Sequence, residues 1–182
     1  MKRFLSLFLC VLAVAACKTR QTAVPITPAD EQFMREAIRL SVESIAHGGG
    51  PFGAVIVKDG EIIAGSANSV TRDNDPTAHA EVNTIRQACR KLGTFDLSDC
   101  VIYTSCEPCP MCLGAIYWAH IKRIYYGNTK KDAADIDFAD DFIYKELDKP
   151  LTKRALPFIP LLHDEAIKTF QAWAEKEDKI EY

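Results

Sequence analysis

The fold of this chain is decided by the stretch Val101–Cys112, whose sequence is VIYTSCEPCPMC. Its first four residues are apolar or β-branched, as in a buried strand, and Leu113–Ala119 is typical of a helix. The cysteines therefore lie where a strand turns into a helix, which is where open α/β sheets place ligands. Cys109 and Cys112 are three residues apart, so on a first helical turn their sulfur atoms share one face. Two thiols in this arrangement can hold one metal ion.

A second unusual triplet, His79-Ala80-Glu81, opens another helix-like run upstream. His79, Cys109 and Cys112 supply three ligands, and catalytic zinc sites use three protein ligands and leave a fourth position for water. Residues two apart inside a helix point to nearly opposite sides. We therefore predict that His79 and Glu81 lie at the first turn, that the second helix begins near Cys109, and that two helix N-termini face one zinc ion per subunit.

Other uses of these residues remain open at this point. A lone Cys-x-x-Cys motif is more often a redox pair or half of a structural zinc site. Cys106 could complete such a site with His79, or join an iron–sulfur ligand set. Glu81 beside the histidine and Pro108 directly before Cys109 favour the catalytic site. Cys89 and Cys100 could form a disulfide, but buried free thiols are the preferred interpretation.

The N-terminus is typical of an export signal. Lys2 and Arg3 form a basic start, and Phe4–Ala16 is an apolar run, interrupted by one serine, that is too short to span a bilayer comfortably. Small residues then lead into Cys17, as in a bacterial lipoprotein box. The sequence predicts cleavage before Cys17 and acylation of that cysteine; ordinary secretion and an uncleaved anchor are the alternatives.

The predicted organisation is a signal peptide over residues 1–16, a lipid-anchored tether over 17–26 and one domain over 27–182. Composition supports a single globular domain, since 48% of the 182 residues are hydrophobic and 26% are charged. The anchor predicts an exported protein that faces the periplasm. The net charge of −3 argues against a nucleic-acid partner, because phosphate binding needs clustered Lys and Arg.

The remaining patterns predict an α/β domain. A capping box at Thr27 begins a helix whose packing face is expected to contain Phe33, Ala37, Ile38, Val42 and Ile45. The elements expected after it are a hairpin over 51–69 with an Asp59-Gly60 turn, a polar loop over 68–77, a helix from His79 to Gly93, a parallel pair of strands at 101–104 and 123–126, and a last helix over 165–177.

From Phe33 to Tyr182 the chain resembles the bacterial guanine deaminases of the cytidine deaminase superfamily. The matching stretches include Gly50–Gly60, Asn74–Val82 and Tyr103–Ala119, which contain the His-x-Glu and Pro-Cys-x-x-Cys signature of zinc deaminases. That signature does not choose a substrate. The tail stretches Asp140–Glu146 and Glu181-Tyr182 resemble the guanine branch rather than the tRNA adenosine deaminases.

The resemblance implies a three-layer α/β/α sandwich with a five-stranded mixed sheet, and a homodimer in which the C-terminal segment crosses onto the partner. It also implies four contacts with a purine substrate, one with the leaving amine and one residue that caps the partner's pocket. Asn68 and the Ala80 backbone would bind the purine, Phe52 and Trp118 would surround its ring, Asp140 would lie near the leaving amine, and Tyr182 would cap the partner's pocket.

The predicted activity is hydrolytic deamination of guanine to xanthine, with Glu81 carrying protons between the activated water, a ring nitrogen and the departing amine. One alternative is a deaminase of another small heterocycle, such as cytosine, a pterin or a triazine. Another is a zinc-stabilised lipoprotein that binds a purine without turning it over.

Overall fold

The computed structural model describes residues 24–181 of the chain. The predicted signal peptide, Cys17, most of the tether and Tyr182 lie outside the described residues. The elements in chain order are α1 (Pro28–Ala46), β1 (Gly53–Lys58), β2 (Glu61–Ala67), α2 (Val70–Asp73), α3 (Ala80–Leu92), β3 (Val101–Cys106), α4 (Pro110–Trp118), β4 (Arg123–Asn128), α5 (Lys130–Ala134), α6 (Asp141–Leu147), the 3-10 turn η1 (Leu151–Lys153) and α7 (His163–Glu175).

The sheet is mixed and has the strand order β2-β1-β3-β4. β1 pairs antiparallel with both β2 and β3, whereas β3 and β4 are parallel and joined through α4. Asp59 and Gly60 turn the β1–β2 hairpin with positive φ angles of 51° and 80°, as a tight two-residue turn requires. The predicted hairpin and the predicted parallel pair are both confirmed.

The expected five-stranded sheet is wrong for the described residues, which form four strands. After β4 the chain enters α5 at once, because the Thr129 side chain and Asp132 form a capping box that starts a helix. The later extended pass contains Pro157 and Pro160, and proline has no backbone N–H to donate to a neighbouring strand. Nothing after β4 therefore extends the sheet within residues 129–181.

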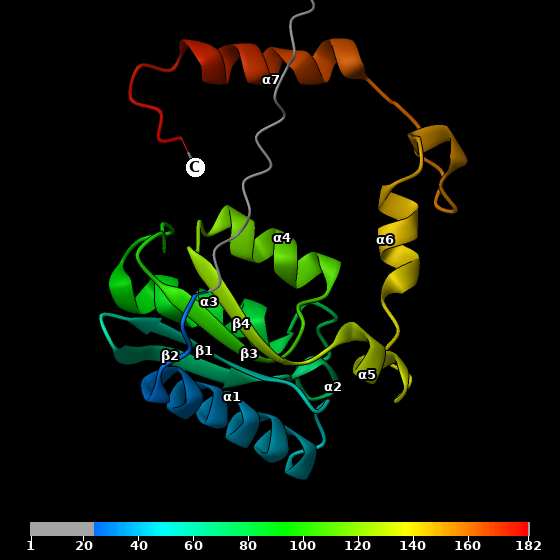
Figure 1. The fold of residues 1–182 in the computed structure, drawn as a ribbon. Helices are drawn as coiled ribbons and strands as arrows, with labels where there is room; N and C mark the ends of the chain where they lie inside the picture. The colour runs from blue at the N-terminus through cyan, green and yellow to red at the C-terminus, as the bar shows by residue number, and fades with distance from the viewer. Residues whose placement is uncertain (1–23, 182) are drawn as a thin grey trace, which may run out of the picture.

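The described fold has the three predicted layers, with α1 on one face of the sheet and α3 and α4 on the other (Figure 1). Alternate residues of β1 point to opposite faces, as a strand dictates. Ala54 and Ile56 join the core beneath α3 and α4, whereas Val55 and Val57 pack against α1. The sheet thus has two buried faces, and both are covered by helices.

The predicted packing face of α1 is only partly right. Phe33 and Ala37 contact the sheet core, but Ile38, Val42 and Ile45 are 45%, 61% and 58% exposed. The side chains buried toward the sheet include the small residues Ala37, Ser41 and Ser44. The backbones approach closely here: a Cβ on Gly53 of β1 would lie 2.3 Å from the Ala37 carbonyl oxygen. Small residues line the closest part of this contact, and the larger side chains of Phe33, Met34 and Leu40 pack around it.

The C-terminal segment extends away from the sheet. α6 lies to one side of the sandwich, and α7 lies apart from the layers (Figure 1). Its apolar side chains Phe170 and Trp173 are 74% and 44% exposed in the single chain. The predicted last helix is confirmed, with bounds two residues earlier than expected. None of the helices within residues 24–181 combines the length and hydropathy needed to cross a bilayer.

Candidate metal centre and active site

Two helix N-termini meet at the predicted metal site. His79 is the N-cap of α3 and Cys109 is the N-cap of α4, both with extended backbone, and Glu81 and Cys112 follow in the first turns. Pro110, the first residue of α4, suits this place because its missing N–H would be unpaired in any case. The geometry predicted for the His-x-Glu and Cys-x-x-Cys motifs is confirmed.

Three soft donor atoms lie together at this junction. The Nδ1 atom of His79 is 3.6 Å from the Cys109 sulfur and 3.5 Å from the Cys112 sulfur, and all three atoms lie within 4.8 Å of one another. One imidazole nitrogen and two thiolate sulfurs suit zinc, which takes such ligands at about 2.0–2.3 Å in a tetrahedral arrangement. Cys106 is not in this group, and its thiol lies 3.7 Å from the Thr129 carbonyl oxygen. A three-ligand site therefore fits better than a four-ligand structural one.

The surroundings favour a thiolate at one of the two cysteines, because the hydrogen bond between them lowers the pKa of Cys109 and raises the pKa of Cys112. The pKa of Cys109 is lowered to about 4, first by a hydrogen bond with Cys112, with further lowering from His79 and from the Cys112 backbone N–H. The positive ends of the α3 and α4 dipoles point at the same place and favour negative charge there. The site can therefore supply a deprotonated ligand at neutral pH.

Glu81 lies beside the donor atoms but points one oxygen away from them. Its side chain is 6% exposed; Oε2 lies 3.4 Å from the Cys112 sulfur, and Oε1 accepts a hydrogen bond of 3.2 Å from the Thr104 hydroxyl. Burial raises the pKa of Glu81, and the negative charge of Cys109 adds to the rise. A buried carboxyl group at this place can accept a proton and return it to a bound molecule.

A cavity of about 510 Å³ opens beside the donor atoms. His79, Cys109 and Glu81 line it together with three of the residues predicted to contact a substrate, namely Phe52, Asn68 and Asp140. These come from chain segments before β1, after β2 and before α6. The fold therefore gathers the metal-binding residues and the predicted substrate residues around one space.

Residues 27–128 of the chain match the family described as the cytidine and deoxycytidylate deaminase zinc-binding region. The chain belongs to this family. The deaminase family binds zinc, and the donor set of His79, Cys109 and Cys112 fits that metal.

The chain is also similar to individual deaminases. The chain is 56% identical to the guanine deaminase of Bacillus subtilis over 153 residues, which cover 84% of this chain and 98% of that protein. The X-ray structure of that enzyme matches with a TM-score of 0.81 over the same shares. A solved structure of guanine deaminase from Nitrosomonas europaea is 32% identical, covers 65% of this chain and 68% of its own, and has a TM-score of 0.59. The tRNA-specific adenosine deaminase of Aquifex aeolicus is 42% identical over 101 residues, which cover 56% of this chain and 67% of its own.

In this deaminase, Asn68 is held so that one end of its amide faces the cavity. Its Oδ1 atom accepts from the backbone N–H groups of Gly50 and Val70 at 3.4 and 3.3 Å. Its backbone carbonyl accepts a 2.9 Å hydrogen bond from the Ser44 hydroxyl. The Nδ2 group is the remaining end of the amide, and it has two hydrogens to donate to a ligand.

Asp140 and Phe52 line other parts of the deaminase cavity. Burial raises the pKa of Asp140, and the nearby Cys109 charge adds to the rise. The Phe52 ring packs edge-on against Phe138, with ring centroids 5.0 Å apart. Phe138 has no assigned role in the sequence prediction, because its contact with Phe52 joins segments more than 80 residues apart and leaves no local pattern.

Two further predicted site residues, Ala80 and Trp118, are absent from the lining of this cavity. Ala80 is fully buried at the start of α3, so its predicted backbone contact stays a prediction. Trp118 is 66% exposed at the end of α4 and lies outside the cavity lining of its own chain. Tyr182 lies outside the described residues.

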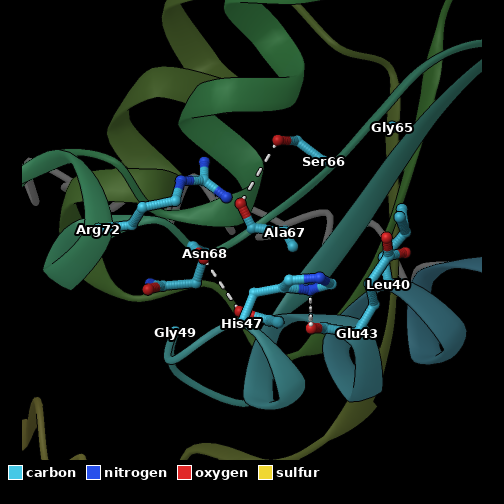
Figure 2. Close-up of a pocket in the computed structure, with 10 residues that line it drawn as sticks. Leu40, Glu43, His47, Gly49, Gly65, Ser66, Ala67, Asn68 and Arg72 are labelled. Carbon is cyan, nitrogen blue, oxygen red and sulfur yellow. Dashed lines mark hydrogen bonds between the residues drawn. The ribbon is translucent and has the colours of Figure 1, made fainter.

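A smaller pocket of about 200 Å³ lies behind Asn68, between the end of α1 and β2. Figure 2 shows Asn68 and Arg72 on one side of it, and Glu43 of α1 with the C-cap residue His47 on the other. The His47 ring contacts the Glu43 carbonyl oxygen at 2.8 Å. Asn68 therefore separates the two pockets, with its amide oriented by backbone groups next to the larger one.

Proposed function

We propose that this protein catalyses the hydrolytic deamination of guanine to xanthine and ammonia. The observation that carries this proposal is the 56% identity to Bacillus subtilis guanine deaminase over 153 residues. The zinc-binding region that all these deaminases share spans only residues 27–128. An alignment of 153 residues within a chain of 182 must extend past this region and include Asp140. The similarity to the Bacillus subtilis enzyme therefore includes the segment around Asp140, which lines the cavity.

The residues divide the reaction between them. His79, Cys109 and Cys112 would hold the zinc ion, which supplies a water of lowered pKa as the nucleophile. Glu81 takes a proton from the attacking water and delivers it to a ring nitrogen. It then transfers a second proton to the amine on C2, so that one water enters and one ammonia leaves.

The cavity residues would hold the base. The Nδ2 group of Asn68 donates to an acceptor of the purine, and the Phe52 ring packs against the purine plane. Asp140, whose pKa is raised by burial, would lie near the leaving amine. The Ala80 backbone N–H would supply a further donor, whereas the ring contact predicted for Trp118 is not made by the cavity lining of its own chain.

The test is release of ammonia from a panel of substrates by the purified, zinc-loaded protein. Guanine should be turned over, with xanthine formed in equal amount. Adenine, cytosine, a pterin and a triazine should give much lower kcat/KM. Absence of ammonia release from guanine would overturn the proposed function, and tight guanine binding without turnover would identify a binding protein instead.

The homodimer is a second part of the proposal. α7 leaves Phe170 and Trp173 exposed in the single chain, and exposed apolar side chains gathered on one helix are typical of an interface. A second copy would cover them, and the crossing tail would bring Tyr182 to the partner's cavity. Sedimentation of the purified protein should give the mass of two chains; a monomer at micromolar concentration would contradict this.

The N-terminus supplies the third part. The sequence of residues 1–17 supports export, cleavage before Cys17 and lipid attachment to that cysteine. The enzyme would then lie on a membrane and face the periplasm. Metabolic labelling with a palmitate analogue should mark the wild-type protein and not the Cys17→Ser variant, which should also leave the membrane fraction.

A further inference from the structure

Thr104 is buried beneath Glu81 and has no role in the zinc motif. It is 1% exposed and lies on β3, two residues after Ile102, so both side chains face the α3 and α4 side of the sheet. Its hydroxyl oxygen is 3.2 Å from Oε1 of Glu81 and 3.0 Å from the carbonyl oxygen of Cys106. A hydroxyl in the core thus contacts the proposed proton carrier directly.

We propose that Thr104 is a positioning residue for Glu81. Its hydroxyl holds Oε1, so that Oε2 is the oxygen turned toward the metal ligands, where it lies 3.4 Å from the Cys112 sulfur. This inference rests on the proposed function, in which Glu81 transfers the protons.

The need for such a contact follows from the freedom of the Glu81 side chain. A glutamate has three rotatable torsions, and a misplacement of about 1 Å of a catalytic group can cost roughly a hundredfold in rate. Packing restricts the aliphatic part of Glu81, but only a polar partner selects which carboxylate oxygen faces the reacting atoms. Among the described residues, Thr104 is the hydroxyl that contacts this carboxylate.

The second contact of Thr104 suits a group that gains and loses a proton. A hydroxyl has one hydrogen and two lone pairs. It can donate to the Glu81 carboxylate, or it can turn its hydrogen to the Cys106 carbonyl and accept from a protonated Glu81. The contact between Thr104 and Glu81 therefore persists through both halves of a proton transfer, and the carboxyl group stays in place.

A purely structural role gives a different expectation. If Thr104 serves only to satisfy the Cys106 carbonyl, its loss should lower the stability of the strand end and the zinc content, and any loss of activity should follow the loss of zinc. The two roles are separated by measuring kcat, KM and bound zinc on the same samples.

The experiment compares the full-length, zinc-loaded wild-type enzyme with Thr104→Val and Thr104→Ser. Valine keeps the shape and removes the hydroxyl, whereas serine keeps the hydroxyl and removes the methyl group. Thr104→Val should lower kcat by about tenfold or more, with KM within about twofold and one zinc per chain. Thr104→Ser should restore kcat to within about threefold of wild type.

A Thr104→Val enzyme whose kcat stays within twofold of wild type, or a Thr104→Ser enzyme as slow as the valine variant, overturns the inference. If the valine variant does not retain zinc, Thr104→Ala replaces it and is judged by the same criteria. A wild-type enzyme that is inactive on guanine overturns the proposed function instead. The Thr104 comparison is then made on whichever substrate of the panel the wild type deaminates.

Discussion

His79 and Cys109 are the N-caps of two different helices, and their ligand atoms lie 3.6 Å apart. A helix N-terminus presents unpaired N–H groups and the positive end of a dipole. Two of them directed at one point offset the charge that two thiolates bring to a metal. The two helix N-termini therefore make the site electropositive, which the two thiolates and the neutral imidazole would not do alone.

Substitution of Glu81 by glutamine should stop turnover without releasing the metal. The amide keeps the size of the side chain and its contact with Thr104, but it cannot carry a proton between water and base. We expect kcat to fall by about a hundredfold or more, with zinc content unchanged. A fully active, zinc-loaded Glu81→Gln enzyme would contradict the proposed mechanism.

Cys112→Ala should lose zinc as well as activity. Cys112 is fully buried and supplies one of the three donor atoms, so its removal leaves too few ligands. The thermal midpoint should fall and should respond less to added zinc than that of wild type. Cys89→Ala is the matched control, because this half-buried thiol packs on the core away from the cavity. Equal zinc content in the two variants would rule out Cys112 as a ligand.

Ser44→Ala should remove a hydrogen bond that fixes the backbone of Asn68 on the side away from the larger cavity. The Ser44 hydroxyl donates to the buried Asn68 carbonyl, and loss of this bond leaves that acceptor unpaired. The free energy of unfolding should fall by about 1–3 kcal/mol, and KM should rise more than kcat falls. Ser41→Ala is the control, since within residues 24–181 the hydrogen bond of the Ser41 hydroxyl goes to the Ile38 carbonyl of its own helix. Chemical denaturation and steady-state kinetics test both variants.

Mixing two inactive variants tests whether the C-terminal segment of one subunit covers the cavity of its partner. Glu81→Gln disables its own site but keeps Tyr182, whereas Tyr182→Ala keeps the proton carrier but lacks the cap. If each tail covers the partner's cavity, subunit exchange should restore activity, because the intact site then receives an intact tail. Continued inactivity after exchange, verified by labelled subunits, would place each tail over its own cavity.

Local patterns predicted most of the site. The Cys109 and Cys112 spacing, the cap positions and the paired motif are all short-range features, and the structure brings their side chains together as expected. The same holds for the Asp59-Gly60 hairpin and for the Thr27 capping box, which depend on residues at most a few positions apart.

Features that depend on how closely elements approach were not predicted. The apolar residues Ile38, Val42 and Ile45 favoured a packing face on α1 that the structure leaves exposed, because the close approach to Gly53 turns the side of the helix with Ala37 and Ser41 toward the sheet. The fifth strand came from the resemblance, and the described residues after β4 form helices and a proline-containing pass. Thr104 was missed because no local sequence pattern shows that a threonine in a strand will contact a glutamate 23 positions away.

His79 and Cys109 are 30 positions apart in the chain, and the segment between them, which contains α3 and β3, begins and ends at the metal site. A metal ion bound there would act on the chain as a cross-link does, by removing conformations from the unfolded ensemble that an open loop could explore. Metal affinity and folding are then one coupled equilibrium. Core substitutions far from the cavity should therefore weaken the apparent zinc affinity once they leave an appreciable fraction of the metal-free chain unfolded, even where every ligand is intact.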